Sequence, residues 1–383
     1  MARRAHRGHL RDLGFRRRIQ DPDSRGMSHA SEFSNRPAAA GKEVCWPTGR
    51  RPVLLVLIDA EEEFDWSRGF DRSATGTTAI RQLLEAQGLF DSLGVKATYV
   101  VTHPVAADPD SAGVMREIAS ANGVTIGAHL HPWVTPPFDE QVSINNSYPG
   151  NLDGALEREK LRCVCQALIE NVGVQPRVYQ AGRYGFGPST ATTLEELGFS
   201  VDFSPAPPFD YRADGGPNFS HHGADPRWIG NAGTLLSVPI TGAYVGFIQE
   251  RAHALYQLAT HRGVKWARLP AILSRLGAVD RLRLSPEGFE LSDMRRLTRV
   301  LLGRGVGVFT LSFHAPSLLP GCTPYVQDSA ERAQFLARLR AYLEYFLGEV
   351  GGESITPLEL RDRLLVAQSP MVGAPARVTG RAN

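Results

Sequence analysis

The sequence has few cysteines and almost no excess of charge. Its 383 residues include only Cys45, Cys163, Cys165 and Cys322, too few and too scattered to staple a chain of this size, so we expect reduced thiols. The net charge is +2 and charged residues make up 21%, which is too little basicity to indicate a nucleic-acid partner. The hydrophobic content of 42% is ordinary for a protein with a buried core.

Long apolar runs are also missing. None approaches the roughly 18 to 20 residues that span a bilayer, so we expect no integral membrane segment. No short apolar core with a small-residue cleavage site follows the basic N-terminus, which leads us to expect a cytoplasmic protein. No feature of the sequence indicates a protein partner, and there is no internal repeat.

The two ends of the chain differ in composition from its middle. Residues 1–50 are predicted to be a basic disordered arm and linker, because the first part is rich in arginine and lacks apolar periodicity, with Met27 as an alternative start. Residues 51–366 are predicted to form one folded domain. Residues 367–383 are predicted to be a disordered tail.

Within the predicted domain, short apolar runs alternate with longer amphipathic stretches, a pattern typical of βα units around a parallel sheet. The pattern therefore predicts a barrel-like α/β fold. The strands are expected at 53–58, 96–101, 124–129, 177–181, 199–203, 235–240 and 306–313. Helices are expected where apolar residues recur every three or four positions, including 78–93, 111–121, 153–172, 188–197, 251–276 and 327–348. Residues 205–233, rich in Pro, Gly and Asp but with several aromatic residues, predict a long packed lid.

Polar residues gather where the predicted strands end. In a barrel of parallel strands, the active site forms at the carboxyl ends of the strands. The candidates at these ends are Asp59, Glu61, His129, His131, Arg183, Tyr184 and His314. They follow four different strands and should meet at one mouth of the barrel.

Two of these groups have the spacing of metal ligands. Side chains at i and i+2 of an extended segment point to the same side, so Asp59 and Glu61 can enter one pocket together, as can His129 and His131. A carboxylate with two imidazoles suits Zn, Mn, Co or Fe. A run of glutamates such as residues 61–63 is, taken alone, more often a solvated face.

The ordered motifs resemble those of the polysaccharide deacetylase family, carbohydrate esterase family four, which contains the NodB-homology domains. The corresponding segments are LIDAEEEFDW (57–66), GAHLHPW (127–133), QAGRYGFG (180–187), VDFSPAPPFD (201–210) and LSFH (311–314). The resemblance implies a distorted barrel of seven βα units. It departs from the common pattern in two places, where Asp-Ala-Glu replaces adjacent aspartates and His-Leu-His replaces a wider histidine pair.

The resemblance also implies a role for each residue. Glu61, His129 and His131 would bind a divalent metal ion, with zinc the first choice. Asp59 would be the general base and His314 the general acid. The remaining residues would assist: Arg183 would orient the base, the backbone N–H of Tyr184 would stabilise the oxyanion, and Asp202 would orient His314.

The implied activity is metal-dependent hydrolysis of an N-acetyl group on a sugar, polysaccharide or glycolipid precursor. Two alternatives remain open. One is hydrolysis of another non-peptide C–N bond, such as that of a small cyclic amide or ureide. The other is a sugar-binding relative that keeps the fold and has lost catalysis, because its metal motifs depart from the common pattern.

Overall fold

The computed structural model describes residues 41–44, 46–246 and 280–368. Most of the predicted arm, nearly all of the predicted tail, Cys45 and the predicted helix 251–276 lie outside these residues. The three described cysteines are free, as expected.

The centre of the fold is a sheet in which seven neighbouring strands run parallel, in the order β11, β2, β3, β4, β5, β6, β8. Each coincides with one of the seven predicted strands, so the predicted α/β barrel-like fold is confirmed. Their bounds are β2 Val53–Ala60, β3 Ala97–Val101, β4 Thr125–Leu130, β5 Val178–Ala181, β6 Val201–Asp202, β8 Leu235–Ser237 and β11 Val308–His314.

Short strands extend this sheet at its margins. β7 (Arg227–Ile229) pairs antiparallel with β8, β1 (Lys42–Glu43) pairs with β7, and β12 (Glu353–Ser354) pairs with β2. Val44 and Trp46, which follow β1, are buried. The packed domain therefore begins before the predicted boundary at residue 51, because this segment supplies both an edge strand and core side chains.

The parallel strands β8 and β11 do not pair with each other, and we call the gap between them the seam. Two further strands close it, and we call this antiparallel pair the hairpin although residues 246–279 separate its strands in sequence. β9 (Gly242–Val245) and β10 (Asp280–Arg283) pair antiparallel, and their ends reach β11. Thr241 N donates to Thr310 O (3.2 Å), and Ser312 N donates to Leu284 O (3.1 Å). The barrel is distorted at this point, because single hydrogen bonds from the hairpin replace a continuous strand ladder.

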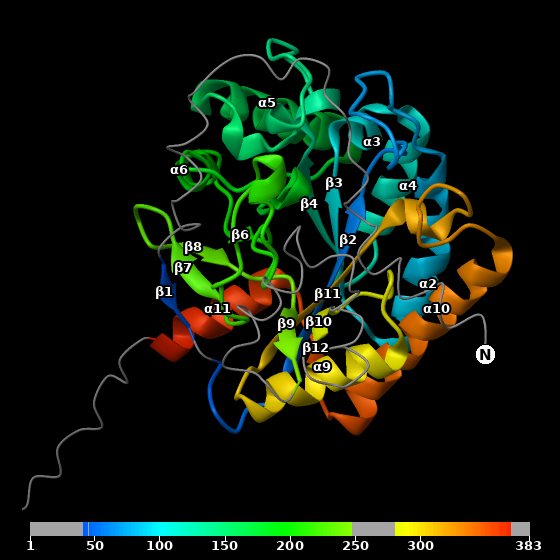
Figure 1. Cartoon of the computed structure of the whole chain (residues 1–383), viewed down its shortest axis with the longest axis vertical. Coiled ribbons are helices and arrows are strands. Elements are labelled where there is room, and N and C mark those ends of the chain that lie inside the picture. The colour runs from blue at the N-terminus through cyan, green and yellow to red at the C-terminus, as the bar shows by residue number, and fades with distance from the viewer. Residues whose placement is uncertain (1–40, 45, 247–279, 369–383) are drawn as a thin grey trace, which may run out of the picture.

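Helices surround the central strands (Figure 1). The predicted helices that fall on described residues are confirmed, and α3, α9 and α11 add to them. The α-helices are α2 Leu83–Leu93, α3 His103–Ala107, α4 Pro109–Ala119, α5 Gly154–Ala167, α6 Thr190–Glu196, α9 Leu291–Gly303, α10 Ser329–Glu344 and α11 Pro357–Gln368. Single turns include η1 Thr78–Gln82, η2 Pro132–Val134, η6 Gly182–Tyr184 and η9 Ala315–Leu318, and π-helical turns η5 Leu168–Val172 and η10 Tyr345–Glu349 extend α5 and α10. No described helix has the length and apolar character that crossing a membrane requires.

Strand β2 shows how the core positions the site. All eight of its residues are buried, which explains its uninterrupted apolar run. Leu54, Val56 and Ile58 pack in a cluster with residues of α2, α4, α5, α9 and α10, whereas Val53, Leu55 and Leu57 pack in a second cluster. Because side chains alternate along a strand, Asp59 continues the face of the second cluster and emerges at the mouth of the barrel.

Residues 205–233 are packed, as predicted, although they are not wholly irregular. Tyr211, Phe219 and Trp228 are buried. The segment contains a short helical turn, η7 (Arg212–Asp214), and strand β7, neither of which was predicted.

Candidate metal centre

Five of the predicted site residues lie together at the carboxyl ends of β2, β4 and β11. Asp59 is near the end of β2, Glu61 follows it, and His129 and His131 lie at and just beyond the end of β4. His314 ends β11 and stands opposite Asp59 in the parallel register. The convergence follows from the parallel sheet, in which all carboxyl ends meet at one edge.

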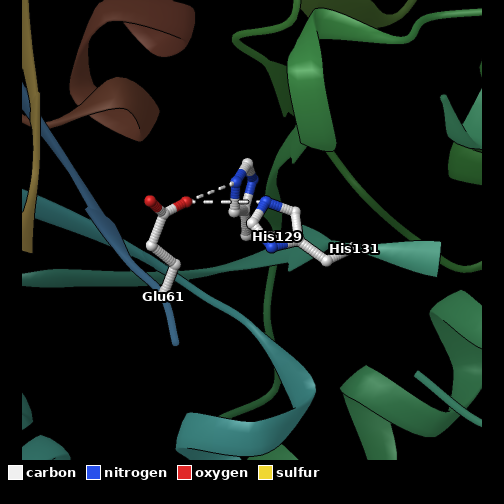
Figure 2. Close-up of side chains that lie close together, drawn as sticks. All are labelled: Glu61, His129 and His131. Carbon is white, nitrogen blue, oxygen red and sulfur yellow. Dashed lines mark ion pairs between the residues drawn. The ribbon is translucent and has the colours of Figure 1, made fainter. Parts of the chain in front are cut away.

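Glu61 faces both imidazoles of the His-Leu-His motif (Figure 2). Its Oε2 lies 3.6 Å from His129 Nε2 and 3.5 Å from His131 Nε2. Two ligand atoms that each lie about 2.0 to 2.1 Å from a tetrahedral zinc ion are about 3.3 Å apart. The spacing of these three atoms therefore matches the coordination shell of one divalent metal ion.

Hydrogen bonds at the far side of each ring fix which nitrogen enters the site. His129 Nδ1 lies 2.9 Å from Gln180 O, and His131 Nδ1 lies 2.7 Å from Glu62 Oε1. When both Nδ1 atoms donate, the two Nε2 atoms carry lone pairs directed at the Glu61 carboxylate. Such an arrangement is repulsive without a cation and is the usual way in which proteins present histidine to a metal.

The three consecutive glutamates have three different roles, so the interpretation of this run as a solvated face is wrong. Glu61 and Glu62 are both buried, and the second of them holds His131. Glu63 accepts hydrogen bonds from Thr78 Oγ1 (2.7 Å) and Ala79 N (2.6 Å) at the start of η1. The chain leaves the strand after Ala60, and for this reason adjacent glutamates can both turn inward.

The charges of the site also fit a cation. Burial, with the charges of Glu62 and Glu287, raises the pKa of Glu61 to about 7 against the effect of the histidines. Burial likewise raises the pKa of Asp59 to about 6. Asp59 Oδ1 and Glu61 Oε1 are buried without a hydrogen-bond partner. Two desolvated carboxylates with unpaired oxygens are groups that a bound metal ion would stabilise.

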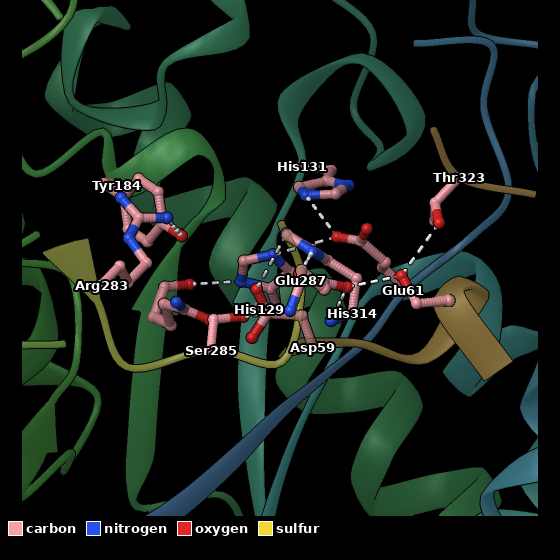
Figure 3. A network of polar contacts seen from close by, with 12 residues as sticks. Asp59, Glu61, His129, His131, Tyr184, Arg283, Ser285, Glu287, His314 and Thr323 are labelled. Carbon is pink, nitrogen blue, oxygen red and sulfur yellow. Dashed lines mark hydrogen bonds and ion pairs between the residues drawn. The ribbon is translucent and has the colours of Figure 1, made fainter. Parts of the chain in front are cut away.

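His314 is held in the same manner as His131, by a carboxylate that the sequence did not reveal. Its Nδ1 lies 2.8 Å from Glu287 Oε2, and its backbone N–H donates to Glu287 Oε1 (3.0 Å). Its Nε2 points at Asp59, 3.6 Å from Oδ2 (Figure 3). Desolvation lowers the pKa of His314, but the charges of Glu287, Glu61 and Asp59 outweigh this effect and raise it to about 10. This raised pKa favours the protonated imidazole at neutral pH.

The prediction that Asp202 orients His314 is wrong. Asp202 accepts hydrogen bonds from Ser204 and from Ser237 Oγ (3.0 Å), so it ties β6 to its neighbours within the barrel. Burial raises its pKa to about 6. Glu287 takes the predicted position instead, because the hairpin at the seam brings the loop after β10 beside β11.

That Arg183 orients Asp59 stays a prediction. Arg183 donates to Ser147 Oγ (2.5 Å), lies 3.7 Å from Asp214 and stacks over the ring of Tyr148. Arg183 and Tyr184 both have positive φ, 53° and 59°, a strained conformation for such residues. The role of the Tyr184 N–H in stabilising an oxyanion stays a prediction.

Glycine at position 182 allows this strained turn to lie against the metal centre. A Cβ there would come within 2.3 Å of Leu130 O and 2.6 Å of His131 Cδ2. Any side chain would therefore displace the His131 ring or the strand that carries it. The turn of Arg183 and Tyr184 therefore packs directly against the strand and the ring of His131.

Aromatic rings form one wall of the site. Trp133 is buried and stacks on His131, with ring centroids 4.3 Å apart. Trp66 is half-buried, meets His314 edge-on at 5.3 Å and stacks on Phe64 at 4.9 Å. Trp133 therefore packs behind the metal ligands, whereas Trp66 keeps part of its surface available.

No protein-family profile and no curated protein matches the sequence. Solved structures do resemble the fold. A candidate polysaccharide deacetylase from Mycobacterium smegmatis has 18% identity and a TM-score of 0.50, with 88% of this chain and 96% of that chain covered. The Puue allantoinase has 16% identity and a TM-score of 0.50, with 85% of this chain and 93% of that chain covered.

At these identities the likeness concerns the fold. It extends over most of both chains and agrees with the seven parallel strands and the site at their carboxyl ends. The chain therefore has the fold of the polysaccharide deacetylases, a distorted barrel of seven βα units.

Proposed function

We propose that this protein is a metal-dependent deacetylase that hydrolyses the N-acetyl group of a sugar, within a polysaccharide or a glycolipid precursor. The observation that carries the proposal is the set of three buried ligand atoms, Glu61 Oε2, His129 Nε2 and His131 Nε2, at 3.5 to 3.6 Å spacing. Beside them lie a carboxylate and a protonated imidazole that belong to a different pair of strands. The likeness of fold to a candidate polysaccharide deacetylase supports the proposed reaction.

Glu61, His129 and His131 would hold the metal ion, for which zinc is the first choice and Mn, Co or Fe also suit the donors. When bound, a divalent cation polarises the amide carbonyl and lowers the pKa of water. Burial lowers the pKa of His129, so its imidazole is neutral, as a ligand must be. Glu62 and Gln180 keep both rings in the orientation that binding needs.

Asp59 is the base. Its Oδ1 is buried and has no hydrogen-bond partner, so this oxygen is available to accept the proton of a water molecule that attacks the carbonyl carbon. A pKa raised to about 6 by burial leaves the carboxylate ionised at neutral pH, yet basic enough to take a proton.

His314 is the acid. Collapse of the tetrahedral adduct breaks the C–N bond, and an amine leaves poorly unless its nitrogen is protonated. Nδ1 of His314 donates to Glu287, and the charges of Glu287, Glu61 and Asp59 raise the pKa of the imidazole to about 10, so Nε2 also carries the proton that this step requires. The side chain is 18% exposed, so the nitrogen of a bound sugar can reach it.

A second candidate is hydrolysis of a small ureide, since the Puue allantoinase has the same fold. The two activities differ in the substrate that must fit. The half-buried Phe64 and Trp66 beside the site favour a sugar ring, on which aromatic side chains stack.

The test combines metal analysis with activity. We expect about one divalent metal ion per chain in the purified protein, and acetate release from one or more N-acetylated glycans or glycolipid precursors that chelator abolishes. A metal-free protein with no activity after zinc is supplied would contradict the proposal. Hydrolysis of allantoin without any acetate release would favour the ureide instead.

A further inference from the structure

A second charged group lies at the barrel mouth, on the seam side of the metal centre. Arg283 ends β10, and its half-buried side chain reaches the site wall (Figure 3). Its Nη1 donates to Tyr184 Oη and its Nη2 to Tyr211 Oη, both at 2.8 Å. The guanidinium carbon lies 4.3 Å from the ring centroid of Phe209 and 4.8 Å from that of Tyr184. The cation is thus held rigidly in an aromatic cage.

Within the described ranges, no carboxylate lies within 4 Å of this guanidinium. Arginines on the neighbouring helices α9 and α10 do have carboxylate partners, Arg296 with Asp280 and Arg338 with Glu290. Arg283 Nε is buried without an acceptor, and each terminal nitrogen has one N–H beyond those given to the tyrosines. A partly buried cation with spare donors and no carboxylate partner among the described residues can bind an anionic ligand, whose oxygens would accept those N–H groups.

The position of this cage ties it to the reaction. Burial strongly raises the pKa of the Tyr184 hydroxyl, Arg283 lowers it, and the charges of Tyr211, Asp59 and Glu287 raise it. Figure 3 shows Arg283 and Tyr184 together at one side of the group formed by Asp59, His129, Glu287 and His314. The chain runs from Arg283 through Ser285 to Glu287, which holds His314. A molecule whose amide lies at the metal centre would bring a neighbouring substituent near Arg283.

We propose that Arg283, in its cage of Tyr184, Tyr211 and Phe209, binds an anionic group of the substrate, a carboxylate or a phosphate. The preferred substrate is then an acidic N-acetylated sugar. This inference rests on the proposed deacetylase function and adds the class of sugar. Arginine suits the task, because its planar fork matches carboxylate and phosphate oxygens.

A purely structural role for Arg283 makes a different prediction. Tyr211 and Phe209 belong to the packed segment 205–233, so the arginine also fastens that segment to β10. If this were its whole purpose, removal of the charge would impair every substrate equally. An anion site would impair acidic substrates alone.

The experiment compares matched substrates with the zinc-loaded enzyme. The neutral sugar is N-acetylglucosamine, the phosphate arm is N-acetylglucosamine 1-phosphate, and the carboxylate arm is N-acetylmuramic acid. For the wild type we expect kcat/KM for at least one acidic sugar to exceed that for the neutral sugar by roughly tenfold or more. In Arg283→Gln this ratio should fall to about one, with kcat/KM for the neutral sugar changed by less than roughly threefold. The acidic sugar whose kcat/KM falls more in Arg283→Gln shows whether the preferred anion is a phosphate or a carboxylate.

Arg283→Lys keeps the charge without the fork and should retain part of the preference, which also covers the case in which the glutamine variant does not fold. Equal ratios in wild type and both variants, or equal losses on neutral and acidic sugars, would overturn the anion site and leave the deacetylase proposal intact.

If no sugar is deacetylated, the proposed function fails and the anion site is judged by calorimetry with inorganic phosphate and glucuronate. A binding event present in the wild type and absent from Arg283→Gln supports the site. Identical isotherms overturn it.

Discussion

Two histidine–glutamate pairs stand at the same mouth of the barrel and differ in what surrounds them. In the first, Glu62 holds His131 Nδ1 at 2.7 Å, and in the second, Glu287 holds His314 Nδ1 at 2.8 Å. Each ring then directs Nε2 at a second carboxylate, Glu61 at 3.5 Å or Asp59 at 3.6 Å. The bonding pattern within the two pairs is nearly the same.

Their surroundings separate them. The His131 side chain is 3% exposed beneath Trp133, and a second imidazole converges on the same carboxylate oxygen. The His314 side chain is 18% exposed, and among the described ion pairs it is the imidazole that meets Asp59, whose pKa the charge of His129 also lowers. The first pair suits a metal ligand, the second a proton donor. A histidine–carboxylate pair therefore acquires its role from its neighbours.

The largest effect is expected when the first pair loses its imidazole. His131→Ala should remove the bound metal and lower deacetylase activity by at least roughly a thousandfold, because the stabilisation that a cation gives the carbonyl oxygen disappears with it. Metal content by elemental analysis and acetate release measure both. His222→Ala, which changes a partly buried histidine in the 205–233 segment, is the matched control and should keep metal and activity. Full metal content in His131→Ala would contradict the assignment.

Next in size are changes to the proton-transfer groups. Asp59→Asn and His314→Gln should each keep the metal and lose roughly a hundredfold to ten-thousandfold in kcat, the range expected for a general base or acid. Metal analysis and initial rates distinguish this outcome from loss of the metal. If Asp59→Asn also strips the metal, Asp59 is a ligand and the division between base and ligands is mistaken.

The two glutamates provide the most direct comparison of the pairs. Glu62→Gln should weaken metal affinity by roughly 10- to 100-fold, as expected for a group that orients a metal-binding histidine. Glu287→Gln should leave metal affinity unchanged and lower kcat, because it disturbs only the imidazole that protonates the amine. Competition with a chelating dye measures the affinities. If both variants weakened metal affinity equally, the assignment of His131 as a metal ligand and His314 as a proton donor would be wrong.

A smaller effect concerns a buried carboxylate without an imidazole partner. Burial raises the pKa of Glu157 to about 7, whereas the charge and hydrogen bond of His131 hold the pKa of the equally buried Glu62 below its usual value despite burial. Between about pH 4.5 and 7, Glu157 is therefore more often protonated in the folded state than in the unfolded chain. Because the folded state binds the extra proton, Glu157 makes the free energy of unfolding fall as pH rises through this window.

Glu157→Gln should therefore gain stability relative to the wild type as pH rises, with the difference changing by on the order of 3 kcal/mol between pH 4.5 and 8. Denaturant unfolding of both proteins at the two pH values measures it. A constant difference would show that the carboxyl is ionised in the fold at all these pH values.

The sheet could be predicted from the sequence because its strands are buried on both faces. β2 and β11 are continuous apolar runs that end in polar residues, and such runs mark parallel strands directly. β7 and β10 were not predicted, because their sequences, RWI and DRLR, are short and contain charged residues instead of an apolar run. Each becomes a strand through its pairing with a neighbour, β7 with β8 and β10 with β9.

The site could be predicted in part for the same reason. Asp59, Glu61, His129, His131 and His314 immediately follow or end recognisable strands, so their convergence follows from topology. Glu62 could not be predicted, because the alternation of an extended chain turns it away from Glu61, and the chain bends after Ala60. Glu287 lies in a Ser-Pro-Glu-Gly turn whose place beside β11 depends on the seam hairpin.

The seam has a consequence for how proteins of this fold can diversify. Within the parallel sheet, the strands from β2 to β6 each form backbone hydrogen bonds with a strand on either side, so a segment inserted between two of them would break these bonds. Between β8 and β11 the backbone hydrogen bonds to β11 come from Thr241 and Leu284, while Ala243, Val245 and Leu282 pack in the hydrophobic core. This hairpin and the loop after it carry Arg283 and Glu287. One short stretch of chain therefore supplies both the residue that holds the proposed proton donor and the proposed substrate contact, so a change in this stretch would alter both without touching the proposed metal ligands.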